Sequence, residues 1–313
     1  MAKMYAHIML VDTICQQKLD SIPTLSATMR QALQNYTPFC NLGAVSPDCP
    51  SLVGATGPTG YGNVMHYLRT ADFVRYAIPQ IHAMNFSLAD TRACIAWIFG
   101  YAAHLVTDLT IHPVISRKFG AYAQSAQNRK EHRLCESHQD VYLYSRFYGR
   151  EIVGSNFLKF SGLAGCSVNG NTNKLSPAIV NLWTYCLQKY SRSEIKQYVR
   201  LPDQSLKPNN WYATFLNLFQ NIVTKGLSFL QGGGYAYPNV SALNPVYLTD
   251  LPTASGKTID YDALFQTTIK NVMDTWGSLA EALDSNKPDL FKLPNANLDT
   301  GLADASGQPV FVV

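Results

Sequence analysis

The chain has 313 residues, of which 25 are Lys or Arg and 21 are Asp or Glu, for a formal net charge of +4. Charged residues make up 15% of the sequence, against about 25% in an average soluble domain, so each buried carboxylate or histidine needs a reason. A net charge this small excludes the basic stripe of a dedicated nucleic-acid-binding protein.

In chain order, the sequence predicts helices separated by turn-rich segments, and the alternation typical of strands is rare. We therefore expect a mostly α-helical fold. The predicted helices are 6–36 (broken near Pro23), 63–83 (Pro79 near its end), 88–112 (N-cap Ser87), 116–127, 129–148, 177–190, 193–199, 211–229 and 261–283. The segments predicted to be irregular are 162–173, 232–252 and 286–313, the last ending in a candidate edge strand, SGQPVFVV.

The segment 54–62 (GATGPTGYG) is rich in glycine but lacks the Lys-Ser/Thr pair of a phosphate-binding loop. It also follows no predicted strand, so we exclude that motif.

No segment reaches the ~18 apolar residues of a membrane span, and the best candidate, 93–106, contains His104. The N-terminus has one lysine and a short apolar run cut by Asp12, without a small-residue cleavage site, so we predict no signal peptide. Seven dispersed cysteines with no CxxC pair predict buried, reduced thiols. We expect a chain that is cytoplasmic as made, with export or translocation into a host as the open alternative.

Metal-competent side chains recur at helical spacing in GYAAHLVTDLTIHP, where His104, Asp108 and His112 are four residues apart. Because four residues turn a helix by about 400°, the three side chains lie within roughly 80° on one stripe. Burying them unpaired on an apolar helix is costly, and a divalent cation removes that cost by binding imidazole nitrogen and carboxylate oxygen. Pro113 predicts that the helix bends or ends near His112, which would turn His112 toward a different ion from His104.

The same spacing recurs in EHRLCESHQD, where His132, Glu136 and Asp140 form a second stripe. By the same helical geometry, His138 and His82 point away from the candidate groups, and we leave both out.

Three further candidates lie outside the stripes. They are Asp48 in the turn-rich NLGAVSPDCP, His66 after the glycine loop, and His7 at the start of the first helix. A single histidine on an apolar helix is more often a hydrogen-bonded core residue, and one HxxxD or HxxxE pair carries little weight. Two such pairs in a charge-poor chain favour a metal centre over the alternative, two ion-paired stripes of structural use.

The succession of NLGAVSPDCP, His66, GYAAHLVTDLTIHP and HRLCESHQD resembles the zinc-dependent phospholipase C family, over roughly residues 5–145. This family takes in bacterial phosphatidylcholine-hydrolysing enzymes and the zinc domain of glycosylphosphatidylinositol phospholipase D, and it is distantly related to the fungal single-strand nucleases. The resemblance implies an all-α bundle around a cleft with two to three zinc ions. Residues 1–285 would form this catalytic domain, and 286–313 an irregular C-terminal tail.

The resemblance also implies a role for each candidate residue. Asp48 matches an aspartate that serves as zinc ligand and proposed general base. His66, His104 and Asp108 match the ligands of one zinc, and Asp108 bridges to a second.

The remaining implied ligands lie on the other two helices. His112 completes a site with His132 and Glu136, the HxxxE pair of another zinc. His7 matches the N-terminal histidine that joins Asp108 on the remaining ion.

The chain departs from the family pattern in two places. His112 follows Asp108 by four residues, whereas the small secreted phospholipases and the nucleases place it six later; the shorter spacing resembles the phospholipase D-type branch. The secreted enzymes also use a processed N-terminal residue as a zinc ligand, and here Met1 or Ala2 would have to serve.

The resemblance implies hydrolysis of a phospholipid such as phosphatidylcholine, at a membrane surface, to diacylglycerol and a phosphorylated headgroup. Zinc-activated water would attack the phosphodiester, and Asp48 would take a proton. The alternatives are a zinc-dependent nuclease, a phospholipase D-type phosphodiesterase, and a non-enzymatic protein with a structural metal. Nucleic acid is not favoured, because the basic cluster at 129–133 is explained by a solvated helix face. The sequence indicates no oligomeric state.

Overall fold

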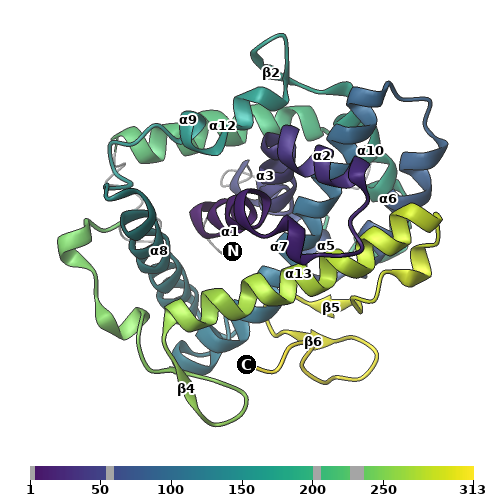
Figure 1. Cartoon of the computed structure of the whole chain (residues 1–313). Coiled ribbons are helices and arrows are strands. Elements are labelled where there is room, and N and C mark those ends of the chain that lie inside the picture. Colours follow the sequence, from purple (N-terminus) through teal and green to yellow (C-terminus); the bar gives the residue numbers. More distant parts are fainter. Residues whose placement is uncertain (1–3, 54–59, 200–205, 226–235) are drawn as a thin grey trace.

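The chain folds into helices that pack around a central one (Figure 1). The computed structural model describes residues 4–53, 60–199, 206–225 and 236–313. Its α-helices are α1 (Met4–Gln17), α2 (Ala27–Asn35), α3 (Thr37–Val45), α4 (Cys49–Val53), α5 (Gly60–Tyr67), α6 (Asp72–Ala83), α7 (Leu88–Phe119), α8 (Ala126–Tyr148), α9 (Phe157–Ser161), α10 (Pro177–Gln188), α11 (Arg192–Ile195), α12 (Pro208–Lys225) and α13 (Tyr261–Ser285). Helix α1 lies in the middle of Figure 1 and contacts α2, α3, α7, α8 and α13. The all-α prediction is confirmed.

In the described part of the chain the strands are very short and form three separate antiparallel pairs. They are β1 (Ser167–Val168) with β2 (Asn171–Leu175), β3 (Leu251–Pro252) with β4 (Thr258–Ile259), and β5 (Ala296–Asn297) with β6 (Leu302–Ala303). The segment 162–173, predicted to be irregular, therefore contains part of a hairpin. The candidate edge strand at the C-terminus is wrong, since that stretch makes only a single bridge, from Pro309 to Leu302.

Helix α7 begins at its predicted N-cap, where the Ser87 hydroxyl accepts a hydrogen bond from the backbone N–H of Asp90 at 3.1 Å. It continues through Pro113 to Phe119, so the predicted end near His112 and the separate helix at 116–127 are wrong. A proline removes one backbone donor, and the helix survives that loss because the turn beyond Pro113 is anchored by buried side chains, Val114 and Ile115. Helix α7 is long and apolar enough to cross a membrane, but its most apolar stretch is completely buried inside the protein.

Helices α3 and α7 approach each other closely because glycine faces backbone on both. A Cβ atom on Gly43 would lie 2.0 Å from the carbonyl oxygen of Trp97, and one on Gly100 would lie 1.8 Å from that of Cys40. Only glycine tolerates such an approach. The close contact brings the end of α3 and the turn that follows it against the middle of α7.

The predicted helix 63–83 is wrong, because the structure divides it into α5 and α6. Between the two helices Arg69 has a φ of 44°. The side-chain oxygen of Asn295 accepts hydrogen bonds from the backbone N–H groups of Ala71 and Asp72, at 2.9 and 3.0 Å. The N-terminus of α6 is thus satisfied by a residue more than 200 positions away, which local spacing does not reveal.

The C-terminal segment 286–313 packs against α5 and α6. Its side chains at Phe291, Leu293, Ala296 and Leu298 are buried, and the backbone N–H of Leu298 donates to the carbonyl of His66 at 3.0 Å. All seven cysteines are buried and free, as predicted. The sequence interpretations of the glycine-rich loop at 54–59 and of Met1 and Ala2 lie outside the described residues.

Candidate metal centre

The structure brings all the predicted ligand residues into one buried cluster. They come from α1, the turn between α3 and α4, α5, α7 and α8. None is more than 5% exposed: His7, Asp48, His66, His104, Asp108, His112, His132 and Glu136.

Within the cluster, the potential ligand atoms form three groups, each with its atoms within 4.8 Å of one another. The groups are His7–His104–Asp108, Asp48–His66–His104, and His112–His132–Glu136. His104 therefore belongs to two groups. His112 and His104 do lie in different groups, but not because the helix breaks: eight residues of continuous helix separate them by about 12 Å.

Asp108 lies between the groups, with its two oxygens facing different histidines. Oδ1 is 3.3 Å from Nε2 of His7 and 3.4 Å from Nε2 of His112. Oδ2 is 3.2 Å from Nε2 of His104 and 3.7 Å from Nε2 of His66. A carboxylate so placed has the arrangement of a bridge between two cations.

Backbone carbonyls fix the orientation of two of the imidazoles. Nδ1 of His66 lies 2.7 Å from the carbonyl oxygen of Gly62, and Nδ1 of His104 lies 2.8 Å from that of Ala44. Each ring therefore presents its Nε2 atom to the cluster, and Nε2 of His66 is 3.3 Å from Oδ1 of Asp48.

Helix α8 contributes two residues to the cluster, and a third polar residue of the same stripe caps the N-terminus of α1. Oε1 of Glu136 lies 3.1 Å from Nε2 of His132 and 3.4 Å from Nε2 of His112. One turn further on, Asp140 accepts hydrogen bonds from the backbone N–H groups of Ala6 (2.8 Å) and Tyr5 (3.3 Å) in α1. Asp140 thus holds the N-terminus of the helix that carries His7.

The two excluded histidines lie in other environments. Nδ1 of His138 accepts a hydrogen bond from the backbone N–H of Asn244 at 3.1 Å, and Nε2 of His82 lies 2.7 Å from the carbonyl oxygen of Leu283. Neither belongs to a metal-competent group within the described part of the chain.

The electrostatics of the cluster favour a cation. Burial raises the pKa of the Asp48 and Asp108 carboxyls, but the neighbouring imidazoles outweigh it and hold the pKa of Asp48 below its usual range and that of Asp108 well below. Burial lowers the pKa of His112, yet the carboxylates of Asp108, Asp299 and Glu136 raise it to about 10. Positive charge is therefore stabilised here, whether a proton or a metal ion supplies it.

The donor set fits zinc. Within the described residues, both ring nitrogens of His7 and His132 and both oxygens of Asp48 and Asp108 are buried without a hydrogen bond. Buried polar atoms are rarely left so, and metal ligation would account for the carboxylate oxygens and for one ring nitrogen of each histidine. Imidazole nitrogen and carboxylate oxygen are ligands that zinc accepts.

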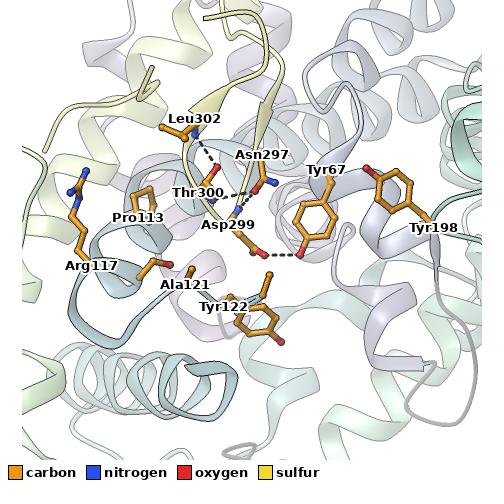
Figure 2. Close-up of a pocket in the computed structure, with 12 residues that line it drawn as sticks. Tyr67, Pro113, Arg117, Ala121, Tyr122, Tyr198, Asn297, Asp299, Thr300 and Leu302 are labelled. Carbon is orange, nitrogen blue, oxygen red and sulfur yellow. Dashed lines mark hydrogen bonds between the residues drawn. The ribbon is translucent and has the colours of Figure 1, made fainter. Parts of the chain in front are cut away.

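Sequence reasoning missed one residue beside the cluster, Asp299, which is 8% exposed. Its Oδ1 is 3.6 Å from Nδ1 of His112, and its Oδ2 accepts a hydrogen bond from the Tyr67 hydroxyl at 2.7 Å (Figure 2). Asp299 lies in the segment predicted to be an irregular tail, where no periodic pattern marks a functional residue.

Asp299 and Tyr67 also line a pocket of about 570 Å³. Its wall further includes Tyr122, Tyr198 and Arg117 (Figure 2). The Tyr122 ring lies 5.2 Å from the ring of His132, between centroids, so the pocket adjoins the metal-competent cluster.

Comparison with known proteins agrees with this geometry. The family model for zinc-dependent phospholipase C matches residues 6–227, which include the whole set of predicted ligands. Neither a curated protein nor a solved structure gives a significant match. With a family match over most of its length and a cluster of histidines and carboxylates suited to the metal, the chain belongs to the zinc-dependent phospholipase C family of phosphodiester hydrolases.

Proposed function

We propose that this enzyme cleaves phosphatidylcholine at a membrane surface, between the diacylglycerol and the phosphate, to release phosphocholine. The observation that carries the proposal is a buried cluster of imidazoles and carboxylates that borders a tyrosine-lined pocket.

The cluster would hold two to three zinc ions. Asp48, His66 and His104 form one set of ligands, and His112, His132 and Glu136 form another. The third set is His7, His104 and Asp108, with Asp108 facing histidines of every set. Zinc ions, when bound, lower the pKa of water and neutralise the charge that develops on a phosphate.

Asp48 is the residue that we propose as the general base. It is completely buried in the turn after α3, and neither of its oxygens accepts a hydrogen bond from a described residue. Its lowered pKa keeps the carboxylate ionised at neutral pH, because His66 and His104 outweigh the effect of burial. An ionised oxygen without a donor is ready to accept a proton from water.

The pocket supports a choline headgroup. Quaternary ammonium groups favour aromatic faces, and here Tyr67, Tyr122 and Tyr198 line the pocket together with Asp299 (Figure 2). A volume of about 570 Å³ is in the range of small-molecule sites.

The test measures zinc and products together. We expect two to three zinc ions per chain, and phosphocholine with diacylglycerol from phosphatidylcholine vesicles. Asp48→Asn should lower kcat by at least about 100-fold, in line with the loss of a general base. Asp274→Asn, at an aspartate that is 65% exposed on α13, is the matched control and should leave kcat unchanged.

Three results would contradict the proposal. They are fewer than two zinc ions per chain, release of choline with phosphatidic acid, and cleavage of single-stranded DNA by an enzyme that leaves phosphatidylcholine intact.

A further inference from the structure

A carboxylate lies behind His112, on the side of the ring that faces away from the metal-competent groups. Nε2 of His112 is 3.4 Å from both Asp108 Oδ1 and Glu136 Oε1, whereas Nδ1 is 3.6 Å from Asp299 Oδ1. The two nitrogens of an imidazole point in divergent directions and do not bind the same ion. Asp299 is therefore placed to orient His112 and is not a fourth ligand of its ion.

Several contacts fix the Asp299 carboxylate. Its Oδ2 accepts the hydrogen bond from the Tyr67 hydroxyl, and its backbone N–H donates to the side chain of Asn297 at 3.0 Å. The preceding residue, Leu298, is buried and donates its backbone N–H to the carbonyl of His66. The C-terminal segment is thus tied to α5, which carries another predicted ligand.

The other histidines of the cluster provide a comparison. His66 and His104 each place Nδ1 against a backbone carbonyl, at 2.7 and 2.8 Å. Nδ1 of His7, of His132 and of His112 makes no hydrogen bond with any residue that the structure describes. Only for His112, among these five, does a carboxylate lie beside Nδ1, in an ion-pair contact of 3.6 Å with Oδ1 of Asp299.

We infer that Asp299 is a positioning residue that holds His112 in the orientation needed to bind metal and, through Tyr67, couples this ligand to the wall of the pocket. The inference rests on the proposed function for the identity of the metal set. The family match ends at residue 227, so a segment outside that match completes the centre. Losing a carboxylate behind a ligating histidine costs about 10–100-fold in metal affinity or activity.

The test measures metal binding without substrate. Asp299→Asn keeps the shape of the side chain and removes its charge, and Asp304→Asn changes an exposed aspartate of the same segment as the matched control. Competition with a chelator should show that Asp299→Asn weakens one zinc about tenfold or more and that Asp304→Asn weakens none. With Co²⁺ in place of zinc, Asp299→Asn should also change the visible absorption bands.

Two further variants make the result decisive. Asp299→Asn should weaken zinc no further in a His112→Ala background, because both changes act on the same ligand. Tyr67→Phe keeps the Asp299 carboxylate but removes the hydrogen bond from the Tyr67 hydroxyl that orients it, so we expect a smaller loss of zinc affinity. This variant decides alone if Asp299→Asn does not fold.

The inference is overturned if Asp299→Asn binds every zinc with an affinity within twofold of wild type and leaves the Co²⁺ bands unchanged. If Asp299→Asn does not fold, the same result for Tyr67→Phe overturns the inference. It is also overturned if the loss is the same with and without His112. Zinc loss in Asp299→Asn together with a wild type inert toward phosphatidylcholine would support the inference and refute the substrate proposal.

Discussion

Helices α7 and α8 carry the same spacing of polar residues, and the third residue serves a different purpose on each. On α7 the stripe ends in His112, which faces Asp108 and Glu136 inside the cluster. On α8 it ends in Asp140, which accepts hydrogen bonds from the N-terminus of α1. Spacing places a side chain on a face, but the element opposite that face determines what the side chain does.

The middle residue of each stripe tests this difference most strongly. Among the described residues, Asp108 faces four histidines from α1, α5 and α7, whereas Glu136 faces two, His112 and His132. We expect Asp108→Asn to lose more than one zinc ion per chain and to lower kcat/KM by at least about 1,000-fold. Glu136→Gln should lose one ion.

Elemental analysis of the purified variants, with kinetics on phosphatidylcholine vesicles, measures both effects. Equal zinc loss in the two variants would show that Asp108 does not bridge the groups.

We expect Asp140, the last residue of the α8 stripe, to contribute to the stability of the fold and not to metal binding. Besides the two N–H groups of α1, Asp140 accepts a hydrogen bond from the Tyr237 hydroxyl at 3.0 Å. An amide cannot accept all three bonds, and bonds to a charged group contribute ~1.5–3 kcal/mol each. Asp140→Asn should therefore lower the free energy of unfolding by about 4 kcal/mol in urea titrations. Zinc at the group of His112 should remain.

The exposed Asp274→Asn variant again supplies the control for Asp140, with an expected change within about 0.5 kcal/mol. If Asp140→Asn instead strips zinc from His112, His132 and Glu136 at unchanged stability, Asp140 belongs to the metal centre after all.

Helical periodicity is local, so four-residue spacing alone brings His104, Asp108 and His112 onto one face wherever the helix packs. The candidates outside the stripes, Asp48, His66 and His7, received their expected roles from the family resemblance, and the structure places them in the same cluster.

What the sequence did not reveal depends on contacts between distant segments. Asn295 caps the N-terminus of α6 within a stretch that spacing alone makes one continuous helix, and Asp299 reaches His112 from a segment without periodicity.

The helix beyond Pro113 and the task of Asp140 show the same limit. A proline predicts a helix end because it removes a backbone hydrogen bond. In α7, the burial of Val114 and Ile115 outweighs the loss of that bond, and the helix continues. Asp140 matches the ligand pattern of its helix, and only the position of α1 shows that it is a cap.

Asp12 on α1 differs from Asp48 and Asp108 in the direction of its pKa shift. It is a largely buried carboxylate that faces an amide instead of imidazoles, so burial dominates. Burial raises the pKa of Asp12 to about 6, although the hydrogen bond from Asn41 opposes the rise. The folded protein therefore binds a proton that the unfolded chain releases near pH 4. Stability falls as the pH rises from about 4 to 6 and stays reduced above that.

Asp12→Asn keeps an oxygen for Asn41 and removes the charge, so at pH 8 it should raise the free energy of unfolding by about 2 kcal/mol, after allowance for partial exposure. At pH 4 the variant and wild type should unfold at the same urea concentration, and an equal gain at both pH values would mean that the charge of Asp12 is not the cause.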